Sequence, residues 1–134
     1  MGDRVLELLK AARTIAVVGL SDHADRPSYG VSAYLQSEGY HVVPVNPRVS
    51  EVLGEKAYPS LSEAAKEHKI DIVDVFRNSN AVPAIVDEVL AQGIPLLWLQ
   101  ETVVHEDAAT RAREAGVVVV MDKCILKEHR RYGL

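Results

Sequence analysis

The 134-residue chain contains a single cysteine, Cys124, so no disulfide can form within it. The absence of disulfides suits a reducing compartment, and we expect a cytoplasmic protein. No apolar run approaches the roughly 20 residues that a membrane-spanning helix needs. Residues 1–10 carry acidic side chains among their leucines and lack the apolar segment of a signal peptide. These absences predict a soluble protein that does not contact membranes.

An excess of positive charge is also absent, since the formal net charge is −4. Nucleic-acid binding through a basic surface is therefore disfavoured, and an anionic ligand would need a local cluster of donors. The 5 histidines show no spacing typical of metal ligands. No Ser/His/Asp arrangement is visible either. The sequence thus predicts neither a metal site nor a catalytic site, and we expect a protein that is not an enzyme.

Cys124 does not stand out as a nucleophile. A reactive thiol needs a nearby cation or a helix terminus that lowers its pKa. Lys123 and Lys127 are close in sequence and offer some activation. We nevertheless expect Cys124 to be a buried packing residue.

The composition is that of an ordinary globular protein, with 48% hydrophobic and 25% charged residues. The length fits one domain, and we expect residues 1–134 to form a single one. Five short apolar runs stand out, and three of them are nearly continuous, as in strands covered on both faces. They occupy residues 15–18, 42–45, 70–76, 96–99 and 117–121.

Helical patterns lie between and around these runs. Apolar residues repeat every three or four positions in 5–12, 31–35 and 82–90. Ser60 with Glu63 has the form of a capping box that begins a short helix, after a second crossover that is mostly loop. The alternation predicts an α/β fold: a single Rossmann-like, doubly wound domain with a five-stranded, mainly parallel sheet.

In such sheets ligands bind beyond the carboxyl ends of the strands. After the first strand, Gly19 lets the chain turn sharply, and Ser28 is a natural N-cap for a helix beginning near Tyr29. A helix N-terminus attracts anions, and Arg26 could add a charge-assisted hydrogen bond. Gly30 would let a ligand or a strand approach the backbone. The alternative is a capped helix after a polar loop, with no ligand.

This loop lacks the glycines of a dinucleotide fingerprint, because Ser21 and Ala24 stand where G-x-G-x-x-G requires glycine. Asn46 ends the second strand in place of the acidic residue that holds the NAD ribose. Arg48 suits an extra ribose phosphate, which NADP and coenzyme A (CoA) both carry. Plain NAD is therefore disfavoured, and Arg48 as a mere loop charge remains an equal alternative.

The ends of the third and fourth strands carry further candidates. Arg77 could close on a pyrophosphate, or it could pair with Asp74 or with a surface acid. We favour a functional role, since arginine at a strand end is poorly placed for the core. Trp98 is expected in the core, and Gln100 points toward the ligand by its position.

Several motifs follow one another in a characteristic order. They are residues 17–21 with 26–31, residues 45–48, Gly54 with residues 57–61, residues 74–77 and residues 121–124. In this order and at this spacing, the chain resembles the stand-alone CoA-binding proteins of the CoA-binding-domain superfamily over about residues 13–130. That superfamily also supplies the N-terminal domain of the succinyl-CoA synthetase α-subunit.

The resemblance implies a Rossmann domain with the CoA nucleotide across the first loop and the end of the second strand. Three groups of residues would surround the ligand. Gly19, Ser21, Arg26, Ser28 and Gly30 would contact the phosphates, Asn46, Pro47 and Arg48 would flank the adenosine 3′-phosphate, and Val75, Phe76 and Arg77 would line the third side.

The chain departs from the ligase because it contains neither the domain with the phosphorylated histidine nor the nucleotide-grasp subunit. We therefore expect non-catalytic binding of CoA or an acyl-CoA, by a carrier, sensor or regulatory module. One alternative is an NADP-dependent oxidoreductase. A second alternative is a subunit of a multi-chain acyl-CoA ligase or acyltransferase assembly. A protein partner or a homodimer remains open.

Overall fold

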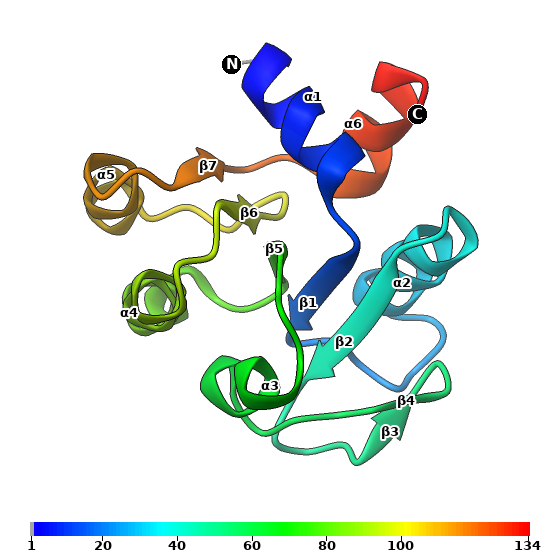
Figure 1. Ribbon diagram of the computed structural model, residues 1–134. Coiled ribbons are helices and arrows are strands. Elements are labelled where there is room, and N and C mark those ends of the chain that lie inside the picture. Colours follow the sequence, from blue (N-terminus) through cyan, green and yellow to red (C-terminus); the bar gives the residue numbers. More distant parts are fainter. Residues whose placement is uncertain (1) are drawn as a thin grey trace.

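The computed structural model describes the backbone of residues 2–134 and the side chains of residues 4–134. Helices and strands alternate along the chain (Figure 1). In order they are α1 (Gly2–Ala11), β1 (Thr14–Val18), α2 (Pro27–Ser37), β2 (His41–Val45), β3 (Glu51–Val52), β4 (Glu55–Lys56), α3 (Leu61–Glu67), β5 (Ile72–Val75), the 3₁₀ turn η1 (Ser79–Ala81), α4 (Val82–Gln92), β6 (Leu96–Leu99), α5 (Glu106–Glu114), β7 (Val118–Val120) and α6 (Ile125–Tyr132).

Five strands form one parallel sheet in the order β2-β1-β5-β6-β7. All five come from the apolar runs of the sequence, and the predicted α/β fold with its mainly parallel sheet is confirmed. The register places five apolar residues side by side across the sheet: Val42, Ile15, Ile72, Leu96 and Val118. Parallel neighbours need covering crossovers, which the helices supply.

Helices cover both faces of the sheet, as expected for a doubly wound domain. In Figure 1, α1, α2 and α6 lie on one side of it and α3, α4 and α5 on the other. Alternate strand residues face opposite layers: Ile15 and Val17 pack with the first group of helices, and Ala16 and Val18 with the second. Each fully buried aliphatic side chain contributes about 1.5–3 kcal/mol, so both layers hold the sheet in place.

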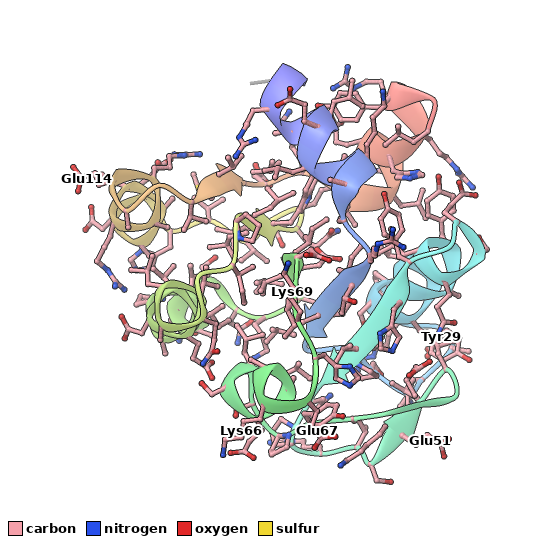
Figure 2. The ribbon with its side chains drawn as sticks, in the orientation of Figure 1. Tyr29, Glu51, Lys66, Glu67, Lys69 and Glu114 are labelled. Carbon is pink, nitrogen blue, oxygen red and sulfur yellow. The ribbon has the colours of Figure 1, made fainter. Side chains whose placement is uncertain are left out.

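The start of α3 follows the predicted capping box. The Ser60 hydroxyl accepts a hydrogen bond from the backbone N–H of Glu63 at 3.1 Å. The loop before it contains an antiparallel hairpin, β3–β4, which the sequence analysis did not predict. The hairpin is fastened to α3, because Lys56 and Tyr58 both hydrogen-bond the Glu67 carboxylate, labelled in Figure 2.

Asp74 is a charged residue type in the middle of the sheet. It lies between Val17 and Trp98 on the neighbouring strands and is 0% exposed. Among the residues that the structure describes, nothing hydrogen-bonds either carboxylate oxygen, so Arg77 does not pair with Asp74. Burial raises the pKa of Asp74 well above its ordinary value. An unpaired carboxylate is costly in such surroundings, so burial favours the neutral acid form of Asp74 in the folded protein.

The buried Asp74 carboxyl makes the stability of the folded protein decrease as the pH rises. Below the ordinary value of 3.8, both the folded and the unfolded chain hold its proton, whereas between that value and the raised folded-state pKa only the unfolded chain releases it. The contribution of Asp74 to stability is therefore lost as the pH rises toward the folded-state pKa. Asp74→Asn removes this titration. We expect the stability of the variant relative to the parent, measured by urea denaturation, to increase from pH 4 to pH 8. A difference that stays constant over this range would contradict a neutral, buried carboxyl.

Candidate functional site

The strand order reverses between β1 and β5. The chain leaves β1 toward β2 on one side, and it leaves β5 toward β6 and β7 on the other. Ligands bind at such switch points, beyond the carboxyl ends of the strands. A cleft of about 510 Å³ lies there. Its lining comes from helix α2 and from the loops after β1, β5, β6 and β7: Gly19, Ser21, Arg26, Pro27, Ser28, Val31, Phe76, Arg77, Asn78, Gln100, Glu101, Thr102, Val103 and Cys124.

Gly19 is the residue at which the chain turns off β1. Its φ is +89°, in the left-handed region, and its backbone N–H donates to the carbonyl of Val45 at 2.8 Å. A Cβ at this position would collide with the carbonyl oxygen of Phe76 and lie 3.1 Å from Cδ of Arg77. Glycine is therefore required both by the turn and by the close approach of the β5 end.

Two serine side chains, one in the loop and one at the start of α2, hold the loop after β1 in place. The Ser28 hydroxyl accepts from the backbone N–H of Ser21 at 3.0 Å, and the Ser21 hydroxyl accepts from that of His23 at 3.0 Å. The prediction that Ser28 caps the following helix is wrong. Helix α2 begins at Pro27 with Arg26 as its N-cap, and no side chain caps it. The Ser28 hydroxyl holds the loop instead, and the uncapped N-terminus of α2 borders the cleft.

Two arginines give this part of the cleft a positive charge. Arg26 and Arg77 both line it, and both are exposed. Neither forms a salt bridge with any residue among 4–134, in contrast to Arg111 or Arg131 on the outer helices. Unpaired guanidinium groups beside a helix N-terminus are a combination suited to phosphate or carboxylate groups.

Six of the eleven predicted binding residues line the cleft: Gly19, Ser21, Arg26, Ser28, Phe76 and Arg77. The other five do not. Gly30 is exposed on α2, and Val75 is fully buried in the layer of α3, α4 and α5. Pro47 and Arg48 are exposed beyond β2, and Asn46 precedes them.

Asn46 joins the loops that follow β1 and β2. Its side-chain N–H donates to the carbonyl of Leu20 at 3.0 Å, and its side-chain oxygen accepts from the backbone N–H of Arg48 at 2.9 Å. Both ends of the amide are thus engaged by the protein itself. The Arg48 guanidinium lies outside the lining of the cleft.

The far rim of the cleft comes from residues after β6 and β7 that were not among the predicted site residues. The backbone N–H of Thr102 donates to the Asp122 carboxylate at 2.7 Å, and Lys127 pairs with Glu101 at 3.0 Å. Thr102 and Asp122 have φ values of 73° and 62°, which few non-glycine residues adopt. The sequence signals for this rim are its position after strands, as for Gln100, and the motif of residues 121–124, which includes Asp122.

Trp98 and Cys124 occupy the positions expected of them. Trp98 is fully buried in the core, and its indole N–H donates to the carbonyl of Lys123 at 2.8 Å. Cys124 is buried and forms no disulfide. It packs in the same layer as Trp98 and also contributes to the floor of the cleft.

Within residues 4–134 there is no group of three or more His, Cys, Asp or Glu side chains placed to hold a metal ion. No helix of the part described is long and apolar enough to cross a membrane. The cleft is therefore the candidate site, and its donors suit an anionic organic ligand.

Comparison with known protein families gives a match to the CoA binding domain family over residues 13–130. A family of proteins that bind an anionic nucleotide is consistent with the donors found in the cleft. The chain belongs to this family. The resemblance noted in the sequence is thus confirmed, and the loops that build the cleft all lie within the matched residues.

Relatives of this CoA binding domain include short proteins and part of a longer enzyme. The uncharacterized protein YneT of Bacillus subtilis is 44% identical over 125 residues, or 93% of this chain and 91% of YneT. A solved structure from Thermus thermophilus has a TM-score of 0.91 and 41% identity, covering 98% of each chain. The ADP-forming acetate–CoA ligase of Methanocaldococcus jannaschii is 24% identical over 92 residues, which are 69% of this chain and 13% of the ligase.

The role of Gly19 gives a testable difference between two glycines of the CoA binding domain. Gly19→Ala should lower the free energy of unfolding by at least about 1–2 kcal/mol, the cost of a left-handed residue with a Cβ, because the Phe76 carbonyl must also move. Gly30→Ala is the matched control, since a Cβ there meets nothing within 4 Å. In a helix this change should be neutral or stabilise by up to about 1 kcal/mol. Urea denaturation measures both, and equal effects would contradict the close approach at Gly19.

Proposed function

We propose that residues 1–134 act as one domain that binds CoA or an acyl-CoA through its nucleotide and phosphate groups. The observation that carries this proposal is the family match over residues 13–130 together with the unpaired Arg26 and Arg77 in the cleft. The donors stand beside the uncapped end of α2, where an anion is favoured.

In this proposal the pyrophosphate of CoA lies over the first turn of α2. Gly19, Ser21, Arg26, Ser28 and Gly30 surround it, with Arg77 closing from the end of β5. Val75 and Phe76 shape that third side, Phe76 by direct contact and Val75 by anchoring the strand in the core.

The adenosine 3′-phosphate is assigned to Asn46, Pro47 and Arg48. Asn46 contacts the loop after β1 through the carbonyl of Leu20, so the two loops form a continuous surface. Arg48 follows two residues after Asn46 and is exposed, which supports its assignment to this phosphate. Asn46 contributes by fixing the loops, since its side chain already bonds the backbone.

We further propose that the chain does no chemistry on its ligand and serves as a carrier, sensor or regulatory module. Support comes from the make-up of the cleft. No histidine is among the residues that line it, and its one carboxylate, Glu101, is engaged by Lys127. The chain spans 13% of the acetate–CoA ligase that it resembles, so the activity of that whole enzyme is not carried over.

Thermal melting with added ligands tests the proposal. CoA at about 100 times its Kd should stabilise the protein by about 2.7 kcal/mol and raise the Tm by several degrees. Dephospho-CoA should give a smaller shift, and NAD none. A shift with NADP alone would instead favour an oxidoreductase, and no shift with any of these ligands would contradict a CoA site in the isolated chain.

Two arginine variants test the assigned positions. Arg26→Ala should weaken CoA binding about tenfold or more, because it removes charge-assisted hydrogen bonds to phosphate. Arg48→Ala should remove most of the preference for CoA over dephospho-CoA. Arg13→Ala is the control, since Arg13 is exposed and directly precedes β1. It therefore lies at the amino-terminal end of the strand, away from the cleft at the carboxyl ends. Titration calorimetry gives the affinities. If Arg26→Ala binds as tightly as Arg13→Ala, the phosphate site is assigned wrongly.

A further inference from the structure

The cleft has two ends of different chemistry. The end beside α2 carries Arg26 and Arg77, which suit an anion. The second end is the part of the lining that follows β6 and β7, which lie beyond β5 in the strand order; it includes Gln100, Thr102, Val103 and Cys124, none of which carries a formal positive charge. The rim beside them holds the carboxylate of Glu101, paired with Lys127. This second end disfavours phosphate and suits an uncharged group.

Gln100 is the polar side chain most deeply placed at that end. Its side-chain oxygen Oε1 accepts a buried hydrogen bond from the backbone N–H of Ile125 at 3.0 Å, at the start of α6. A backbone N–H can only donate, so the atom facing Ile125 must be the oxygen and not the amide nitrogen. The orientation of the amide is thereby fixed, with Nε2 directed away from α6.

The main chain of Gln100 is held as firmly as its side chain. Its N–H donates to the carbonyl of Val75 at 3.3 Å, and its carbonyl accepts from the N–H of Val103 at 2.9 Å. These bonds tie the residue to the end of β5 and to its own loop. The amide group is therefore set in one position before any ligand arrives.

Nε2 of Gln100 takes part in none of the hydrogen bonds found among residues 4–134. Three side-chain polar atoms in that part of the chain are fully buried and have no hydrogen-bond partner. They are Ser32 Oγ and the two Asp74 carboxylate oxygens. Nε2 is not one of them. The 5% of Gln100 that remains exposed therefore includes this nitrogen, and Gln100 is one of the residues that line the cleft.

We propose that Gln100 is a specificity-determining residue whose Nε2 donates a hydrogen bond to a carbonyl oxygen in an uncharged arm of the ligand. The inference rests on the proposed function, in which the phosphates occupy the arginine end of the cleft. A nearly buried N–H₂ group requires an acceptor once a ligand displaces the water around it. The neutral lining beside Gln100 selects a carbonyl over an anion. In CoA this oxygen belongs to an amide of the pantetheine arm, and in an acyl-CoA it can also belong to the thioester.

Gln100→Glu isolates the donor. The variant keeps an oxygen for the Ile125 N–H, so the start of α6 is preserved, but it replaces the N–H₂ donor by an acceptor. Its affinities for CoA, acetyl-CoA and adenosine 3′,5′-bisphosphate, which lacks the arm, are measured by titration calorimetry beside those of the parent. We expect CoA binding to fall about 10- to 100-fold, the range for an acceptor left facing an acceptor, with a much smaller loss for the bisphosphate.

Gln100→Met is the neutral companion variant. It removes the donor without adding a negative charge, and it should also weaken CoA more than the bisphosphate. A loss for CoA itself assigns the carbonyl to the amide arm, and a loss confined to acetyl-CoA assigns it to the thioester. Both outcomes support the donor role.

Two results would overturn the inference. If both variants bind CoA and acetyl-CoA as tightly as the parent does, Gln100 contacts no ligand carbonyl, although the proposed CoA site stands. If Gln100→Glu weakens all three ligands equally while Gln100→Met weakens none, charge repulsion explains the loss. Failure of the parent protein to bind CoA would instead refute the proposed function, and the role of Gln100 with it.

Discussion

At the end of β1, the backbone of Gly19 passes so close to the carbonyl oxygen of Phe76 that no Cβ fits between them. This approach lets β1 and β5 remain hydrogen-bonded neighbours up to their last residues, with the N–H of Phe76 donating to the carbonyl of Val18. The two chains then separate toward opposite sides, and the cleft occupies the space between them. A Cβ at Gly19 would meet the Phe76 carbonyl and Cδ of Arg77, so the end of β1 and the residues after β5 could not both keep their positions.

The sheet could be predicted because parallel strands buried on both faces need apolar residues at nearly every position. The apolar runs therefore marked all five strands, to within one or two residues at their ends. The hairpin β3–β4 could not be found in this way, since strands of two residues have no periodicity to read. It is held by hydrogen bonds from Lys56 and Tyr58 to α3, which only the tertiary structure brings together.

The sequence predicted where the cleft lies, at the carboxyl ends of the strands. It predicted less well which atoms the polar side chains there would contact. Small polar side chains at strand ends have two uses, binding the protein's own backbone or binding a ligand, and the sequence does not separate them. Ser28 was expected to cap α2, yet its hydroxyl bonds the loop at Ser21, while Pro27 begins the helix without needing an N–H partner. Both the nitrogen and the oxygen of the Asn46 side-chain amide hydrogen-bond the protein, at Leu20 and Arg48. Of the Gln100 amide only the oxygen does so, and this difference follows from the position of Ile125 in the folded structure.

The distribution of charge indicates that an anionic ligand is attracted by a few side chains at the cleft and not by the protein as a whole. With a net charge of −4, the molecule as a whole does not attract polyanions, and many of its basic side chains are neutralised by acidic neighbours on the helices. Arg26 and Arg77 form no salt bridge within residues 4–134, and both lie at one end of the cleft. Screening by salt limits such charges to a range of about 8–10 Å. In the proposed binding mode the pyrophosphate is therefore held at that end, the 3′-phosphate lies outside the cleft at Arg48, and the uncharged arm faces neutral groups such as the Gln100 amide. Discrimination between ligands that share the same phosphates then depends on this neutral end.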